Sequence, residues 1–167
     1  LRGCRGGSMM RTAWLLSLMA GWCLFPLLDV RAAAGGVAPS DTDPAITNFN
    51  NVHTWSVDTS GLGRRNTLFV MLPGTGGIPF VYQQVVRAAS EFGFHAVGLM
   101  YPNALAVNEA CAFSPDPDCH EKARREIITG ADLSPLYAVD RVHSIEHRLI
   151  RLIQFLHNNH PSRGWGQ

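Results

Sequence analysis

The 167-residue sequence has few charged side chains and no run of charges of one sign. Asp, Glu, Lys and Arg make up 16% of the residues, and the formal net charge is +1. The arginine pairs at 64–65 and 124–125 are isolated in the sequence. Proteins that bind nucleic acids carry basic patches or stripes, so we do not expect this chain to bind nucleic acid.

Internal repeats and low-complexity tracts are also absent. The length is sufficient for one domain with its own hydrophobic core. No Asn-x-Ser/Thr acceptor occurs, so glycosylation gives no indication of the compartment.

A membrane anchor needs an uninterrupted apolar run of about 20 residues, and the chain has none of that length. Its longest run, residues 12–28, is broken by Pro26, follows Arg11 and precedes small residues at 30–32 and 32–34. These features predict a cleaved signal peptide at residues 9–34, with an anchor as the alternative. Residues 1–8, which begin with Leu1, would be a leader or frame extension. The mature chain would be secreted, or periplasmic or lumenal, with no stable membrane span and a formal charge of −2.

Two of the four cysteines, Cys111 and Cys119, remain after removal of that leader. They flank a seven-residue segment, AFSPDPD, that is rich in turn-forming residues. In an oxidising compartment an even pair at this spacing predicts a disulfide, which would stabilise the fold by about 2.5 kcal/mol. Two free thiols are the alternative.

Residues 35–51 are rich in Gly, Ala, Pro, Asp and Asn and are expected to form a flexible start to the mature chain. Residues 53–58 alternate between polar and apolar side chains, with Trp55 and Val57 on one side, which predicts a half-buried outer strand. Residues 67–72 are continuously apolar, which favours a strand covered on both faces, as in a parallel sheet.

A helix is predicted directly after this strand. Pro79 would lie near its first turn, and Gly93 would end it. Apolar residues recur at helical spacing at positions 81, 85, 88 or 89, and 92. A second apolar strand is predicted at 95–101, which completes a βαβ unit with a right-handed crossover.

Two further helices are predicted. The first spans residues 119–129 and ends at Gly130, with Arg124, Arg125 and Glu126 expected on its surface. The second spans residues 139–157 and carries the clearest apolar stripe. The stripe consists of Val142, Ile145, Leu149, Leu152, Ile153 and Leu156.

The turn PGTGG at residues 73–77 follows the apolar strand directly and is the main candidate site. A phosphate loop would need Lys-Ser/Thr at its end, which is missing. A dinucleotide fingerprint would need a third glycine where Pro79 stands. An oxyanion hole remains, in which the backbone N–H groups of Thr75, Gly76 and Gly74 face an oxygen that gains charge. A tight turn without a chemical role is the alternative.

The segment Tyr101-Pro-Asn103 ends the second predicted strand of this unit. Ligands of α/β proteins bind at the carboxyl ends of parallel strands. A ligand-binding position and a purely structural turn are therefore both open for Tyr101 and Asn103.

Residues 68–103 resemble the start of an α/β-hydrolase core. In that superfamily a strand ends in His-Gly-x or Pro-Gly-x, a helix follows, and the next strand ends near Tyr-Pro. These elements stand here at residues 72–75, 80–92 and 97–102, and the helix at 139–157 resembles the one that precedes the nucleophile strand. The resemblance implies a partial α/β-hydrolase fold over residues 52–167, with a parallel βαβ sheet core and flanking helices. It implies the N–H of Thr75 as an oxyanion donor for a small-molecule ester or acyl substrate, without a cofactor.

The chain departs from that family at the nucleophile. The family's Gly-x-Ser-x-Gly motif is absent, and the nearest string, SGLG at 60–63, lacks the first glycine. The catalytic acid and histidine follow the nucleophile in this fold, so no catalytic side chain is assigned here. We expect an N-terminal fragment of a secreted serine hydrolase that is inactive alone. A secreted, non-enzymatic binding module on the partial fold is the alternative.

A second motif, HSIEH at 143–147, matches the His-x-x-Glu-His pattern of one class of zinc metalloproteases. His143 and His147 are one helical turn apart and face one way. The helix phase places them opposite the apolar stripe, on a face expected to be solvated. A zinc site also needs a third protein ligand, and no Asp or Glu follows residue 147. A zinc hydrolase through His143 and His147 is therefore the least favoured function, and we expect no metal.

Overall fold

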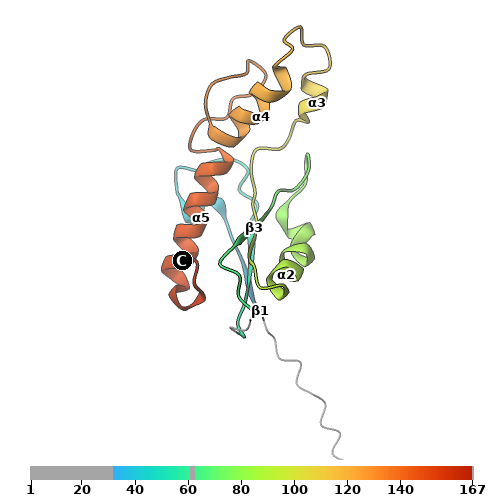
Figure 1. Ribbon diagram of the computed structural model, residues 1–167. Coiled ribbons are helices and arrows are strands. Elements are labelled where there is room, and N and C mark those ends of the chain that lie inside the picture. Colours follow the sequence, from blue (N-terminus) through green and yellow to red (C-terminus); the bar gives the residue numbers. More distant parts are fainter. Residues whose placement is uncertain (1–31, 61–62, 167) are drawn as a thin grey trace, which may run out of the picture.

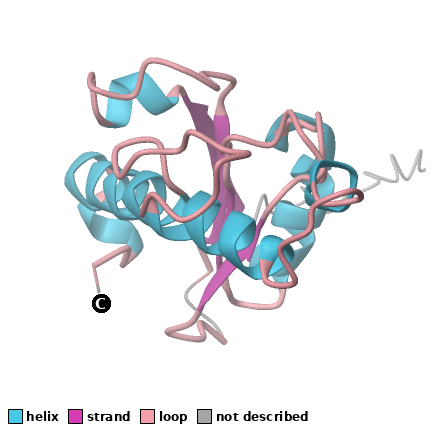
Figure 2. Cartoon of the chain, turned by 90° about the horizontal axis from the view of Figure 1, so that it is seen from above, coloured by secondary structure: helices cyan, strands magenta, loops and turns pink. Residues whose placement is uncertain are grey.

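The computed structural model describes residues 32–60 and 63–166. The predicted leader and all but the last three residues of the predicted signal peptide lie outside these residues. A four-stranded sheet stands between helix α2 on one face and helix α5 on the other (Figures 1 and 2). The strand order is β1 (Ala32–Val37), β2 (His53–Asp58), β4 (His95–Gly98) and β3 (Leu68–Met71).

The sheet is mixed. β3 and β4 are parallel, whereas β1 pairs with β2 and β2 pairs with β4 in antiparallel fashion. The α/β class is therefore confirmed, but the expected parallel sheet core is correct for one strand pair only. The helical connection within that pair is the 3-10 turn η1 (Pro79–Tyr82) followed by α2 (Gln83–Glu91). Pro79 begins it, and Gly93 follows it with φ of 87°, as the sequence predicted.

β2 is an inner strand, and the prediction of a half-buried outer strand was wrong. All six of its residues are buried. The cause is β1, whose sequence AAAGGV carries a single branched residue, Val37, and no aromatic residue to signal a strand. The segment expected to be a flexible start instead contains the end of β1 and the helix α1 (Pro39–Thr42), and it buries Ile46 completely.

β3 lies at the other edge of the sheet, and the prediction that it is covered on both faces was also wrong. Leu68 is exposed and the following three residues are half-buried. Within the described residues no strand pairs with its outer edge. The continuous apolar run that suggested a central strand therefore borders an open edge.

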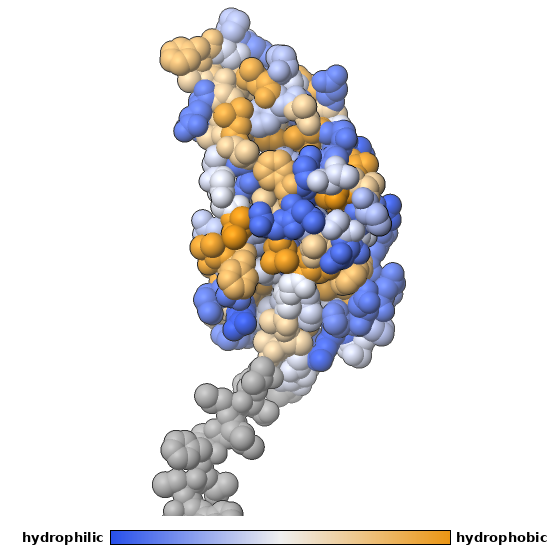
Figure 3. All heavy atoms as spheres, turned by 180° about the vertical axis from the view of Figure 1, so that it is seen from behind, coloured by the Kyte–Doolittle hydropathy of each residue, from blue (hydrophilic) through white to orange (hydrophobic). Residues whose placement is uncertain are grey.

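The apolar residues at positions 81, 85 and 92, whose spacing predicted this helix, lie away from the core. Val81 and Phe92 are 69% and 70% exposed, and Val85 is also exposed. The face that packs on the sheet consists of Val86, Ala89 and Ser90. Figure 3 shows apolar side chains gathered on the back of the molecule, where such residues remain uncovered. The spacing predicted the helix correctly and its buried face incorrectly.

The second half of the described chain forms α3 (Val107–Ala110), α4 (Cys119–Thr129), α5 (Ile145–Asn159) and the 3-10 turn η2 (Pro161–Arg163). The limits of α4 agree with the prediction, including Gly130 in a left-handed conformation at its end. α5 begins six residues later than predicted, because the Ser144 hydroxyl accepts the N–H of His147 and caps the helix there.

Two hydrophobic clusters hold the helices on the sheet. Beneath α2, Val86 and Ala89 pack on Ala96 of β4. Beneath α5, the larger cluster consists of Val37, Trp55, Val57, Val97, Leu99, Leu152, Leu156 and Trp165. The predicted apolar stripe of the last helix faces this cluster, since Ile145, Leu149 and Ile153 pack against it.

Arg148 is fully buried beside this cluster. Its guanidinium donates to the carbonyl oxygens of Asn48 (2.8 Å) and Phe49 (3.1 Å), and its Nε donates to that of His143 (3.0 Å). A longer contact of 3.4 Å reaches the carbonyl of Met100 beyond β4. Burial lowers the pKa of Arg148 to about 10, and Asp140 opposes that shift, so the side chain stays charged at neutral pH. One side chain thus joins α5, the loop after α1 and the end of β4.

We expect Arg148→Met to lower the free energy of unfolding by about 3–5 kcal/mol, because the partly buried carbonyl oxygens of Asn48, Phe49 and His143 lose this donor. Urea unfolding followed by circular dichroism measures the change. The matched control is Arg125→Met, since Arg125 makes one exposed ion pair with Glu121. It should cost less than about 0.5 kcal/mol. Equal effects of the two substitutions would contradict the role given to Arg148.

Candidate functional site

The glycine turn after β3 is a type II turn. The N–H of Gly77 donates to the carbonyl of Gly74 at 2.9 Å, and Gly76 has a φ of 69°. Thr75 precedes it with a negative φ, since Phe49 is the non-glycine residue with a positive φ in the described chain. A positive φ at the third position of the turn is what demands glycine there.

Asn103 holds this turn in place from the end of the neighbouring strand. Its side-chain amide donates to the carbonyl oxygens of Gly74 (2.8 Å) and Gly77 (2.9 Å). Its own carbonyl accepts the N–H of Gly76 at 2.8 Å. Asn103 is 5% exposed, so these bonds are partly buried. The turn is therefore fixed at several points and has little freedom to relax.

Tyr101 supports the same turn one residue earlier, because its hydroxyl donates to the carbonyl of Pro73 at 2.8 Å. Burial raises the pKa of Tyr101, and the charge of Arg124 opposes that rise. Of the two roles left open for Tyr101 and Asn103, these bonds correspond to the structural one. The sequence contained a signal for this role. An asparagine that follows one strand can donate its side-chain amide to the carbonyl oxygens of a glycine turn that follows the neighbouring strand.

The backbone N–H groups of the turn differ in their availability. Gly76 and Gly77 donate within the structure, so the N–H of Gly76 is not available to a ligand. Within the described residues no acceptor lies at the N–H of Thr75 or of Gly74, and both residues are exposed. The turn therefore presents up to two donors at the carboxyl end of β3, and of the three predicted donors Thr75 and Gly74 remain.

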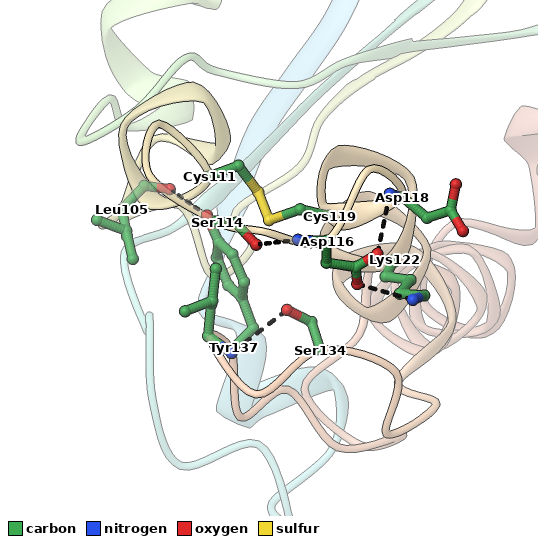
Figure 4. The surroundings of a disulfide bond; sticks show 10 residues. Leu105, Cys111, Ser114, Asp116, Asp118, Cys119, Lys122, Ser134 and Tyr137 are labelled. Carbon is green, nitrogen blue, oxygen red and sulfur yellow. Dashed lines mark hydrogen bonds and ion pairs between the residues drawn. A yellow bond between two sulfur atoms is a disulfide. The ribbon is translucent and has the colours of Figure 1, made fainter.

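The disulfide Cys111–Cys119 is formed, as predicted, with the two Cα atoms 5.9 Å apart. It joins the end of α3 to the start of α4, in the part of the chain that lies beyond the carboxyl ends of β3 and β4 (Figure 1). Figure 4 shows Tyr137 beside this bond, where its hydroxyl donates to the carbonyl of Leu105 at 3.1 Å. Residues 104–139 thus form a cap at the end of the sheet that carries the glycine turn.

Glu126 organises this cap from within. It is 1% exposed, and the expectation that it is a surface charge was wrong. Its carboxylate accepts the N–H groups of Leu133 (3.1 Å), Ser134 (2.8 Å) and Val139 (3.1 Å). Three charge-assisted bonds to backbone donors explain how a carboxylate is tolerated in the interior.

The histidines of the HSIEH motif are not on a solvated face, which corrects the prediction. The side chains of His143 and His147 are 14% and 18% exposed. His143 bonds Asp140 at 2.7 Å, and His147 bonds Asp43 at 2.8 Å. Both rings are used to join α5 to its surroundings. In the described parts of the chain, no group of three or more His, Cys, Asp or Glu residues is arranged to hold a metal ion.

Among the described residues, none of the helices combines the length and apolar character that a bilayer crossing requires. Comparison of the chain with protein-family models, with curated proteins and with solved structures gave no match.

We expect Asn103→Ala to destabilise the protein by about 1–3 kcal/mol, since the Gly77 carbonyl loses its donor and the Gly74 carbonyl keeps only the N–H of Gly77. Asn103→Asp should be at least as damaging, because a carboxylate of the same shape would face those oxygens. Urea unfolding gives the stability, and hydrogen exchange at the Gly76 N–H reports the loosened turn. Asn66→Asp, at an exposed position, is the control and should change neither. Unchanged exchange at Gly76 in both Asn103 variants would refute the clamp.

We expect the free energy of unfolding to depend on pH through Asp43. Its pKa is lowered, first by the N–H of Ala45 and then by the bond from His147, with Arg151 adding to the effect. A lowered carboxyl pKa stabilises the fold above the ordinary value of 3.8, and this stabilisation is lost as the pH falls through the lowered value. We therefore expect Asp43→Asn to flatten the fall in unfolding free energy below about pH 4.

The measurement is urea unfolding at a series of pH values. Asp41→Asn is the control, because Asp41 is exposed and makes no ion pair in the described residues. The assignment fails if the pH profiles of the Asp43→Asn and wild-type proteins run parallel in acid.

Proposed function

We propose that this chain is the N-terminal part of a secreted α/β-hydrolase-type domain whose complete form hydrolyses an ester or related acyl bond. The observation that carries the proposal is the N–H of Thr75, which is exposed and without an acceptor in the described residues, in a fixed turn at the end of β3. In α/β-hydrolases one of the two oxyanion donors comes from the loop between the third strand and the helix that follows. Thr75 lies between β3 and the helical segment that follows it, which is the position this loop would have.

The order of elements supports the same proposal. β3, the glycine turn, α2 and β4 form a parallel pair with a helical crossover, and β4 lies between β3 and β2. The turn is at the carboxyl ends of the parallel strands, where open α/β sheets bind ligands. The disulfide in the cap is compatible with export through the predicted signal peptide.

The open edge of β3 also accords with a partial domain. Its outer side has no partner in the described chain, and Val81 of η1, Val85 of α2 and Phe92 directly after α2 are uncovered. An unprotected apolar edge is unusual in a finished soluble fold, because it invites pairing with other strands. Further strands of the same domain would cover both features.

In this proposal the chain supplies an oxyanion donor and no attacking group. The serine would stand on a Gly-x-Ser-x-Gly turn outside residues 1–167, and its own following N–H would be the second donor. As serine attacks the acyl carbon, negative charge develops on the acyl oxygen, and a donor already held in position stabilises it without reorganisation. The substrate class is a small-molecule ester or acyl compound, and no cofactor takes part.

The alternative of a non-enzymatic binding module has one observation in its favour. The described residues already form a packed unit with two hydrophobic clusters and a buried arginine network. A module that is complete in itself should unfold cooperatively as a monomer. A partial domain should aggregate through its open edge, so thermal unfolding combined with light scattering separates the two.

The donor role is tested by Thr75→Pro in the complete protein. Proline fits the second position of a type II turn and removes the N–H group together with the threonine side chain. We expect kcat to fall by about 10²–10³ with little change in KM. Thr75→Ala keeps the N–H and is the control, which should retain activity. The result would count against the proposal if Thr75→Pro were as active as Thr75→Ala.

The reaction class is tested separately with a fluorophosphonate probe, which labels activated serines. It should label one serine of the complete protein and none within residues 1–167. Specific labelling of a serine in this chain, or no labelling of the complete protein, would overturn the serine-hydrolase proposal.

A further inference from the structure

A cavity of about 270 Å³ that is open to solvent lies between β1, β2 and the α2 side of the sheet, apart from the open edge of β3, and most of its lining residues are exposed. Its apolar lining includes Ala34, Gly36, Val52, Phe80 and Val86. Ala34 pairs with Ser56, whose hydroxyl bonds Ser90 of α2, so this position of β1 belongs to the α2 face of the sheet. Ala34 and Gly36 are too small to fill the space beside the helix, and the cavity results.

One wall of the cavity is polar and carries an arginine. Gln83 and Arg87, one helical turn apart on α2, both line it. The exposed residues Arg125, Arg141 and Arg151 each pair with a carboxylate. Arg87 has no such partner in the described part of the chain, although it is also exposed. An arginine beside an apolar cavity thus retains its full capacity to bind an anion.

We propose that this cavity binds a small monocarboxylate with a short unbranched apolar chain. The chain occupies the space over Ala34 and Gly36, and the carboxylate is bound by Arg87 with the amide of Gln83. Apolar walls with a few polar groups that fix orientation are the usual form of a small-ligand site. Guanidinium groups bind carboxylates through paired, charge-assisted hydrogen bonds.

Thr54 also lines the cavity, but its hydroxyl has no role in the proposal. Thr54 Oγ1 is sealed from solvent, and a Cβ atom on Gly98 would lie 2.5 Å from it. Specificity for an acid therefore rests on Arg87 and Gln83. The proposal is independent of the hydrolase function, because it uses none of the residues of the glycine turn.

The first test is a titration of the full chain with hexanoate, followed by two-dimensional ¹H–¹⁵N NMR. Saturable shifts are expected at the N–H groups of Gly35 and Gly36 and in the first turns of α2. Hexylamine has the same chain length and the opposite charge, and it should bind at least about tenfold more weakly. Absence of localised shifts, or equal binding of acid and amine, would overturn the proposal.

The second test uses variants. Ala34→Leu fills the cavity and should abolish hexanoate binding while stability is kept or raised. Arg87→Gln should weaken hexanoate binding about tenfold and leave the binding of hexanol unchanged. Arg124→Gln removes another exposed arginine that has no ion pair in the described residues and is the matched control. Unaltered hexanoate affinity in Arg87→Gln would overturn the assignment even if Ala34→Leu failed to fold.

Discussion

The buried guanidinium of Arg148 is the interaction on which the arrangement of this chain most depends. It is charged, fully enclosed and bonded to main-chain carbonyls of three separate segments. A buried charge without compensation is very costly, so these carbonyls must be presented together whenever the protein is folded. The loop after α1, the start of α5 and the end of β4 are thereby fixed relative to one another. The end of β4 leads directly to Tyr101 and Asn103, and so the same constraint reaches the glycine turn.

The glycine turn itself follows one physical rule: each backbone group near it is either bonded or exposed to solvent. Asn103 satisfies two carbonyls and one N–H with a single residue. Gly74 and Thr75, whose N–H groups have no acceptor in the described residues, are exposed. This division is what a site for a developing negative charge requires, because its donors must be both available and held still. It is also why one of the three predicted donors, Gly76, is better described as part of the scaffold.

Helix ends and the disulfide, which depend on nearby residues, could be predicted from the sequence. Which strands and helix faces are buried could not. Pro79, Gly93, Gly130 and the cysteine pair act within a few residues of themselves, so their roles were visible in the sequence. The burial of β2 depends on β1, whose alanines and glycines carry no strand signal. For α2, apolar spacing fixed the helix but could not tell a face that packs on the sheet from one left uncovered. Arg148 and Glu126 were missed because charged residues are rarely enclosed, and only the fold reveals their backbone partners.

The cap also determines how much the sequence and length of this part of the protein can vary. In the described chain, the hydrogen bonds of residues 105–139 join that segment to itself, apart from the one that Thr129 accepts from Arg141. The disulfide and the Glu126 bonds close it internally in the same way. Because its hydrogen bonds are internal, a change in the length or sequence of this segment would alter the pairing of no strand in the described chain. Variation at this end of the sheet would remodel the surroundings of the glycine turn while the turn itself stays unchanged.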